Sequence, residues 1–325
     1  MTTLWDTTGS AVVRALAAER RTGGAVTSGI ALTLVVVVEE KDVAAAEEAA
    51  TIAASKHPMR MLMVIRRQID APVPRLDAEV LLGGRLGPGE AVVMRMHGRL
   101  ALHAESVTLP LLAPDAPVIT WWHGSPPDRI SYDPLGVFAD RRITDVACTT
   151  DRIAALRQRA VDFAPGDTDL AWTRITGWRA ALASAFDAVR EEATGASVDG
   201  DSADPSALLL AGWLSAKLGC YVPVRKTSNS GVSQVTLEFG ATVVTLFIDG
   251  NRLVLRRDGQ PDSFAPFPDR SPGELLAEEL RRLDHDKTYA QALSTVTDVR
   301  GIENRPSTRV HVWIDPALTG SVAAN

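Results

Sequence analysis

Residues 32–38 read Leu32-Thr33-Leu34-Val35-Val36-Val37-Val38, and the charged segment Glu39-Glu40-Lys41-Asp42 follows them directly. A nearly continuous apolar run of this length, rich in β-branched valine, is typical of a strand that is buried on both faces of a sheet. Asp42 can cap a helix that extends to Ser55, and Met59 to Ile65 supplies a second apolar strand. The stretch therefore predicts a βαβ unit, and with it a first half built as a layered α/β domain.

Further along the first half, a glycine-rich loop at Gly83–Gly89 lies between two short apolar runs, Ala78–Leu82 and Glu90–Met96. This arrangement predicts a β-hairpin, and a hairpin inserts antiparallel pairing into the sheet. We favour a hairpin connection over a phosphate-binding loop, because a phosphate loop should open a helix. We therefore expect a mixed sheet, followed by a helix over Leu102–Leu112.

The second half has the pattern of a smaller α+β domain. Asp204-Pro205 and Gly219 bound a helix as its N-cap, first-turn proline and C-terminal glycine, and Ser271-Pro272-Gly273-Glu274 is a capping box that starts another. Strand signals between residues 221 and 256 predict an antiparallel meander with helices covering one face. We expect domains at 1–165 and 166–325, with a flexible segment near 191–203 where the sequence is polar and contains glycine and serine.

Length and composition limit the classes of function. The chain has 325 residues, which is above the size of about 250–300 residues at which single cores stop growing. Its net charge of −6 leaves no basic field for nucleic acid, and its longest apolar run is too short to span a membrane. The N-terminus lacks a secretion signal, and Cys148 and Cys220 fall in different predicted domains, so we expect a cytoplasmic protein with two buried thiols.

Sequence motifs for catalysis are missing. The six histidines have neither metal-ligand spacing nor partner cysteines, and the chain has no G-x-S-x-G elbow and no G-x-x-x-x-G-K-[ST] phosphate loop. We therefore predict no catalytic residues, no cofactor and no metal, and we expect that the chain is not an enzyme.

Four residues stand out as candidates for a partner interface. Trp121 and Trp122 are adjacent at a predicted strand end, so their side chains must point to opposite faces of the sheet. Arg141 and Arg142 begin the next predicted strand. Tryptophan and arginine are enriched at binding hot spots, although core packing of both rings and local ion pairing of both arginines remain alternatives.

Several segments, in this order, resemble the actinobacterial form of a known family, the glucose-6-phosphate dehydrogenase assembly protein family OpcA. The resemblance covers most of the chain and rests on Gly24–Thr27, Leu109–Leu112 with Pro114–Val118, Trp121-Trp122, Asp133–Gly136 with Asp140–Asp145, Asp169–Arg174 with Trp178-Arg179, Ala211–Leu214 and Leu276–Asp284. It implies a non-catalytic partner that binds glucose-6-phosphate dehydrogenase and supports its active oligomer in the oxidative pentose phosphate pathway.

Two other interpretations stay open. In the first, the chain is a sensor or enzyme that binds a small ligand at the carboxyl ends of its N-terminal strands, with Trp121–Ser125 and Arg141 lining the pocket. In the second, it is a self-assembling scaffold without an enzyme partner.

Overall fold

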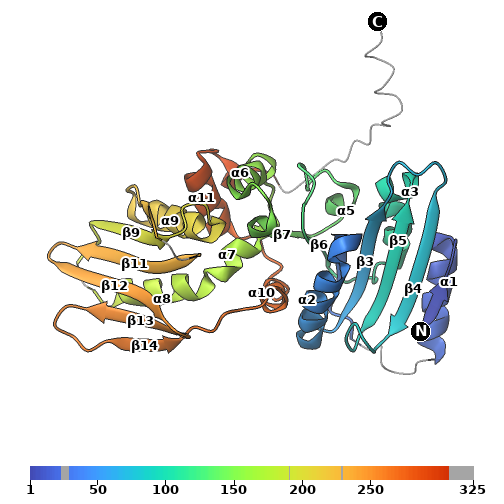
Figure 1. Cartoon of the computed structure of the whole chain (residues 1–325), viewed down its shortest axis with the longest axis horizontal. Coiled ribbons are helices and arrows are strands. Elements are labelled where there is room, and N and C mark those ends of the chain that lie inside the picture. Colours follow the sequence, from blue (N-terminus) through green and yellow to red (C-terminus); the bar gives the residue numbers. More distant parts are fainter. Residues whose placement is uncertain (23–28, 190, 228–229, 307–325) are drawn as a thin grey trace, which may run out of the picture.

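The structure is a computed structural model that describes residues 1–22, 29–189, 191–227 and 230–306. It contains two sheets, one of eight strands and one of six, which lie at opposite ends of the molecule with helices around each (Figure 1). The predicted layered α/β architecture with a mixed sheet and a second, smaller α+β part is confirmed.

The eight-stranded sheet contains the predicted βαβ unit. Its order is β1 (Thr2–Leu4), β4 (Arg75–Leu82), β5 (Glu90–His97), β3 (Met59–Arg67), β2 (Leu32–Glu39), β6 (Val118–Trp122), β7 (Arg141–Thr144) and β8 (Asp167–Asp169). The strands from β5 to β8 run parallel, whereas β4 pairs antiparallel with β5 and with β1. The hairpin predicted around Gly83–Gly89 is therefore confirmed.

Helices cover both faces of this sheet, which explains why its central strands are apolar throughout. Leu34 and Val36 face α2 (Val43–Lys56) and α10 (Pro272–Glu279). Val35 and Val37 face the opposite layer, which is made of α1 (Gly9–Thr22), α3 (Arg99–Leu102), α4 (Glu105–Thr108) and α5 (Pro134–Val137). Alternate residues of β2 thus enter two separate cores.

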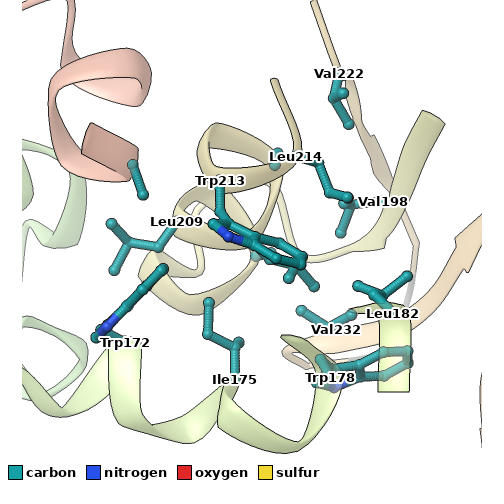
Figure 2. Packing of buried hydrophobic residues seen from close by; sticks show 14 of the residues in the cluster. Trp172, Ile175, Trp178, Leu182, Val198, Leu209, Trp213, Leu214, Val222 and Val232 are labelled. Carbon is teal, nitrogen blue, oxygen red and sulfur yellow. The ribbon is translucent and has the colours of Figure 1, made fainter. Parts of the chain in front are cut away.

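The six-stranded sheet has its helices on a single face. Its order is β10 (Val224–Lys226), β9 (Gly195–Gly200), β11 (Val232–Phe239), β12 (Thr242–Asp249), β13 (Arg252–Arg257) and β14 (Ser263–Pro266). The third core lies between its inner face and α6 (Arg152–Asp162), α7 (Leu170–Arg174), α8 (Thr176–Asp187), α9 (Pro205–Leu218) and α11 (Lys287–Thr297). Figure 2 shows Trp213 of α9 in this core, beside Trp172, Ile175 and Trp178. Trp172, Trp178 and Trp213 are therefore core residues.

Helix ends follow their local signals. The Asp204 side chain accepts a hydrogen bond from the Ser206 amide, and α9 ends at Gly219 with a left-handed φ of 65°. Ser271 and Glu274 form the predicted capping box at the start of α10. These signals involve only neighbouring residues, so they can be interpreted without knowing the fold.

Three sequence predictions are corrected. The segment 191–203, expected to be flexible, contains β9, which pairs with both β10 and β11 and is largely buried. Since β10 runs parallel to β9, the second sheet is not a pure antiparallel meander. The helix expected over Leu102–Leu112 is interrupted: α3 ends at Leu102, α4 spans Glu105–Thr108, and a 3₁₀ turn with Pro110 at its start follows at Leu109–Leu111.

The contacts also cross the expected boundary between residues 165 and 166. Strand β8 lies beyond that boundary but completes the first sheet by pairing with β7. Helix α6 lies before it but packs in the core of the second sheet. Helix α10, which we expected to cover the second sheet, packs against α2 on the first.

Candidate functional site

The carboxyl ends of β2, β3 and β6 surround a crevice of about 710 Å³. In the order β5-β3-β2-β6-β7-β8, the chain first continues from β2 to β3 and β5 on one side of β2. It then crosses to β6, β7 and β8 on the other side of β2. This is the strand order of dinucleotide-binding sheets, in which ligands bind at the point where the order reverses. The crevice is therefore the place in this fold to examine for a nucleotide.

The charged side chains around the crevice are neutralised by one another. Lys41 Nζ lies 2.9 Å from a Glu39 carboxylate oxygen, and Arg67 Nε lies 3.2 Å from Glu40. Arg66 Nη2 pairs with Asp133 at 3.2 Å. Because each cation already faces a carboxylate, the crevice presents no concentrated positive field to an anionic ligand.

The turn after β2 does not fit a dinucleotide. A pyrophosphate needs glycines that let backbone amides approach it and a helix N-terminus free to receive its charge. Here the turn reads Glu39-Glu40-Lys41-Asp42, and Asp42 stands at the N-cap of α2. Carboxylates occupy the place of the phosphate, so like charges would repel the ligand. The residues present do not fit NAD or NADP.

The alternative ligand site is only partly assembled. Trp122, His123 and Ser125 line the crevice as that interpretation expected, but Arg141 does not. The His123 ring packs edge-on against Trp121, with centroids 5.0 Å apart. Burial lowers the pKa of His123, so the imidazole is mainly neutral near pH 7 and adds no positive charge.

The two candidate tryptophans are both in the core. Trp121 and Trp122 point to opposite faces of β6, as predicted, but each face is covered by its own helix layer. Their exposed fractions are 0 % and 1 %. The hypothesis that either ring is an exposed anchor for a partner is not compatible with this burial.

The two candidate arginines are buried and internally paired. Arg141 pairs with Glu279 at the end of α10 and donates to the Asp284 carbonyl at 2.7 Å. Arg142 pairs with Asp167 of β8 and donates to the Pro165 carbonyl at 2.6 Å. Their role is to hold α10 and β8 against the first sheet, so they do not present a surface to a partner.

A second cluster of charges joins the two sheets at the ends of β7 and β8. Arg174 of α7 holds Asp145 in a bidentate pair at 2.7 and 2.5 Å. Asp169 caps α7 through the Ala171 amide at 2.9 Å and accepts the Thr144 hydroxyl at 2.6 Å. Burial, together with the nearby Asp145 charge, raises the pKa of Asp169 to about 6.

Sequence reasoning found only part of this cluster. Aspartate is a favoured N-cap residue, and Asp169 caps α7 in this way. Nothing local to the sequence indicated that Asp145 would meet Arg174, because the pair forms between residues 29 positions apart. The cluster positions α7, and its carboxylates Asp145 and Asp169 are buried.

Both cysteines are free, and they are less buried than expected: Cys148 is exposed and Cys220 is half-buried. Partial burial of the sulfur and the Asp145 carboxylate raise the pKa of Cys148 to about 11, which keeps the thiol protonated at neutral pH. Within the described residues, no three His, Cys, Asp or Glu side chains gather as metal ligands would. None of the described helices is both long and apolar enough to cross a membrane.

These observations define a class: a doubly wound α/β chain with carboxylates in the turn after β2, joined to a six-stranded sheet that the described helices cover on one face only. Comparison with family models then identifies the family. Residues 50–161 match the glucose-6-phosphate dehydrogenase subunit N-terminal domain, and residues 165–293 match the C-terminal domain of the same subunit. The chain belongs to the OpcA family of glucose-6-phosphate dehydrogenase assembly subunits.

No curated protein matches the chain in sequence. Among solved structures, KijD10, a 3-ketoreductase from Actinomadura kijaniata in complex with NADP and TDP-benzene, has 10 % identity and a TM-score of 0.45, covering 82 % of this chain and 96 % of its own. An NAD binding oxidoreductase from Klebsiella pneumoniae has 11 % identity and a TM-score of 0.41, covering 85 % and 96 %. Likeness at this level does not establish an activity.

Proposed function

We propose that this chain is a non-catalytic partner of glucose-6-phosphate dehydrogenase that binds the enzyme and stabilises its active oligomer, within the oxidative pentose phosphate pathway. The observation that carries the proposal is the match of both halves, in order, to the two domains of a dehydrogenase subunit family. The free cysteines are compatible with action in the reducing cytoplasm.

The chemistry of the strand-end crevice supports a non-catalytic role. A dehydrogenase of this fold binds its dinucleotide pyrophosphate at the N-terminus of the helix after the first parallel strand. Here Glu40 lines the crevice, and Asp42 is the N-cap residue of that helix, α2. Lys41 and Arg67, which line the crevice, are already paired with Glu39 and Glu40 and so offset less of the repulsion between these carboxylates and a pyrophosphate. The charges that line the crevice therefore support a function in which the chain does not itself perform hydride transfer.

Activation of the dehydrogenase would follow because binding of the chain is coupled to the enzyme's oligomer equilibrium. A partner that binds only the competent oligomer shifts the population toward it, by an amount limited by the difference in affinity. With the chain at about 100 times its Kd, the dehydrogenase oligomer gains about 2.7 kcal/mol. Since Trp121, Trp122, Arg141 and Arg142 are buried, the contact surface must be formed by other, exposed residues.

The test is to mix the purified chain with the dehydrogenase of the same organism and to measure co-elution, melting temperature and turnover. We expect a complex, a higher Tm for the dehydrogenase and faster turnover, whereas the chain alone should neither oxidise glucose 6-phosphate nor shift its own Tm with NADP. An acidic carrier protein of similar size is the control. Turnover by the chain alone, or two proteins that neither co-elute nor alter each other's kinetics, would overturn the proposal.

A further inference from the structure

A pocket of about 700 Å³ lies beside α6, outside the strand-end crevice. Part of its lining comes from the loop after β6, with Arg129 and Tyr132, and part from Val161 and Phe163 at the end of α6. Arg305, which follows the last described helical turn, donates to the carbonyls of Val161 and Phe163 at 2.8 Å each and completes the lining. Segments from both halves of the sequence therefore meet at this pocket, and such junctions are common places for ligand sites.

A buried carboxylate belongs to the lining of this pocket. The side chain of Asp162 is only 3 % exposed, and it accepts hydrogen bonds from the Ser131 amide at 3.1 Å and from the Ser131 hydroxyl at 2.8 Å. Because a carboxylate has about four acceptor positions, acceptor capacity remains for a ligand. Burial raises the pKa of Asp162, although the Ser131 hydrogen bonds oppose this effect. A carboxyl group with a perturbed pKa in a pocket is typical of a binding site.

Two arginines line the same pocket, and neither has a carboxylate within hydrogen-bond distance among the described residues. Arg129 Nε lies 4.0 Å from Asp162 Oδ1, which is too far for a hydrogen bond. Its guanidinium stacks on the Tyr132 ring, 3.8 Å from the centroid, and this contact keeps it off the carboxylate. Arg305 uses only Nη1 for its two carbonyl acceptors, so its other donors are available. The remaining described residues that line the pocket are uncharged.

We propose that this pocket binds an α-amino acid with an apolar side chain, in its zwitterionic form. The ammonium group of the ligand lies at Asp162, and its carboxylate lies at Arg129 and Arg305. The apolar side chain contacts Val161 and Phe163. Binding at this pocket does not require the dehydrogenase.

The charges of the pocket select this class of ligand. A simple anion would pair with Arg129 and Arg305 but would be repelled by the buried Asp162, and a simple cation would be repelled by the two arginines. A zwitterion satisfies all three groups, and the charge-assisted hydrogen bonds that it forms are of the strong kind.

The first test compares three ligands by isothermal titration calorimetry on the full chain near pH 7. L-phenylalanine carries both charges, 3-phenylpropionate lacks the ammonium group, and phenethylamine lacks the carboxylate. We expect L-phenylalanine to bind and each analogue to bind at least about 10-fold more weakly, because one charged group of the pocket then stays unpaired. L-leucine and L-valine test whether the pocket accepts apolar side chains as a class.

The second test uses three single variants. Arg129→Gln should weaken L-phenylalanine binding about 10-fold or more, because it removes one partner of the ligand carboxylate. Arg157→Gln is the matched control, since it removes the same charge from an exposed arginine of α6 that does not line the pocket. It should leave binding unchanged.

The third variant, Asp162→Asn, keeps a side-chain oxygen for the Ser131 amide. It should weaken L-phenylalanine binding and strengthen 3-phenylpropionate binding, because the charge that attracts the ammonium group also repels the anion. A general loss of structure would weaken both ligands, so opposite responses identify the charge itself. Circular dichroism checks that each variant folds, and if Asp162→Asn does not, Arg129→Gln against Arg157→Gln still decides.

Three results would contradict the proposed amino-acid site. The first is no binding of L-phenylalanine, L-leucine or L-valine up to about 10 mM. The second is equal affinity for the zwitterion and its two single-charge analogues. The third is equal loss of binding in Arg129→Gln and Arg157→Gln. Amino-acid binding by a chain that does not activate the dehydrogenase would support this site and count against the proposed function alone.

Discussion

The two sheets of this chain are exposed to solvent in opposite ways. Strand β2 of the first sheet is buried at seven consecutive positions, because helices cover both of its faces. Strand β12 of the second sheet alternates between buried and open positions, because helices cover only one. The difference teaches how each sheet is stabilised: the first sheet buries both of its faces under helices, whereas the described helices cover only one face of the second.

The largest expected effect on the free energy of unfolding comes from comparing one large aromatic residue in each sheet. Trp122→Ala should lower the free energy of unfolding by about 3–5 kcal/mol, because it empties a fully buried site between β6 and α5. Phe264→Ala, on the open face, should lower it by about 1 kcal/mol or less. Urea unfolding at the same low chain concentration measures both. Equal losses would contradict the division into a two-sided and a one-sided sheet.

A second effect concerns the connection between the sheets at Asp169. Its pKa of about 6 in the folded chain exceeds that of an unfolded aspartate, so between about pH 4 and pH 6 the folded chain binds more protons than the unfolded one. The protonated Asp169 stabilises the folded chain at low pH. As the pH rises through 6, this contribution is lost and the free energy of unfolding falls by about 3 kcal/mol. This slope opposes that of ordinary ion-paired carboxylates.

The measurement is the free energy of unfolding at several pH values for the wild type and for Asp169→Asn, which keeps a side-chain oxygen for the α7 cap. We expect the variant to lose the decline between pH 4 and pH 6. Asp262→Asn is a control, because the Arg256 hydrogen bond lowers the pKa of that exposed carboxyl. An unchanged slope in Asp169→Asn would show that this carboxyl titrates normally.

Much of the fold could be predicted from the sequence wherever the deciding contacts are local. The valine run predicted β2, the glycine loop predicted the β4–β5 hairpin, and capping residues predicted the starts of α9 and α10. Strand β9 could not be predicted in this way, since its residues Gly195, Ser197 and Asp199 have loop composition. They form a strand because β10 and β11 pair with them from both sides.

The candidate site shows the same limit. Alternation along β6 predicted that Trp121 and Trp122 diverge, but whether a divergent ring is exposed depends on which helices cover each face. Likewise, an arginine pair at a strand start does not reveal its partners. Glu279 reaches Arg141 from 138 residues away, so the pairing exists only after the chain has folded.

The smallest effect concerns α10, which lies in the second half of the sequence but covers the first sheet. At Gly273 this helix approaches α2 so closely that a Cβ atom would lie 2.7 Å from both the Ala49 carbonyl oxygen and the Ile52 Cβ. Gly273→Ala should therefore lower the free energy of unfolding by about 1–3 kcal/mol, despite the better helix propensity of alanine. The same change at Gly9, where the nearest atom is 3.5 Å away, should be neutral or slightly stabilising. If thermal unfolding ranks the two variants in the opposite order, α10 is not held against α2 in solution, and α2 alone permanently covers that face of the first sheet.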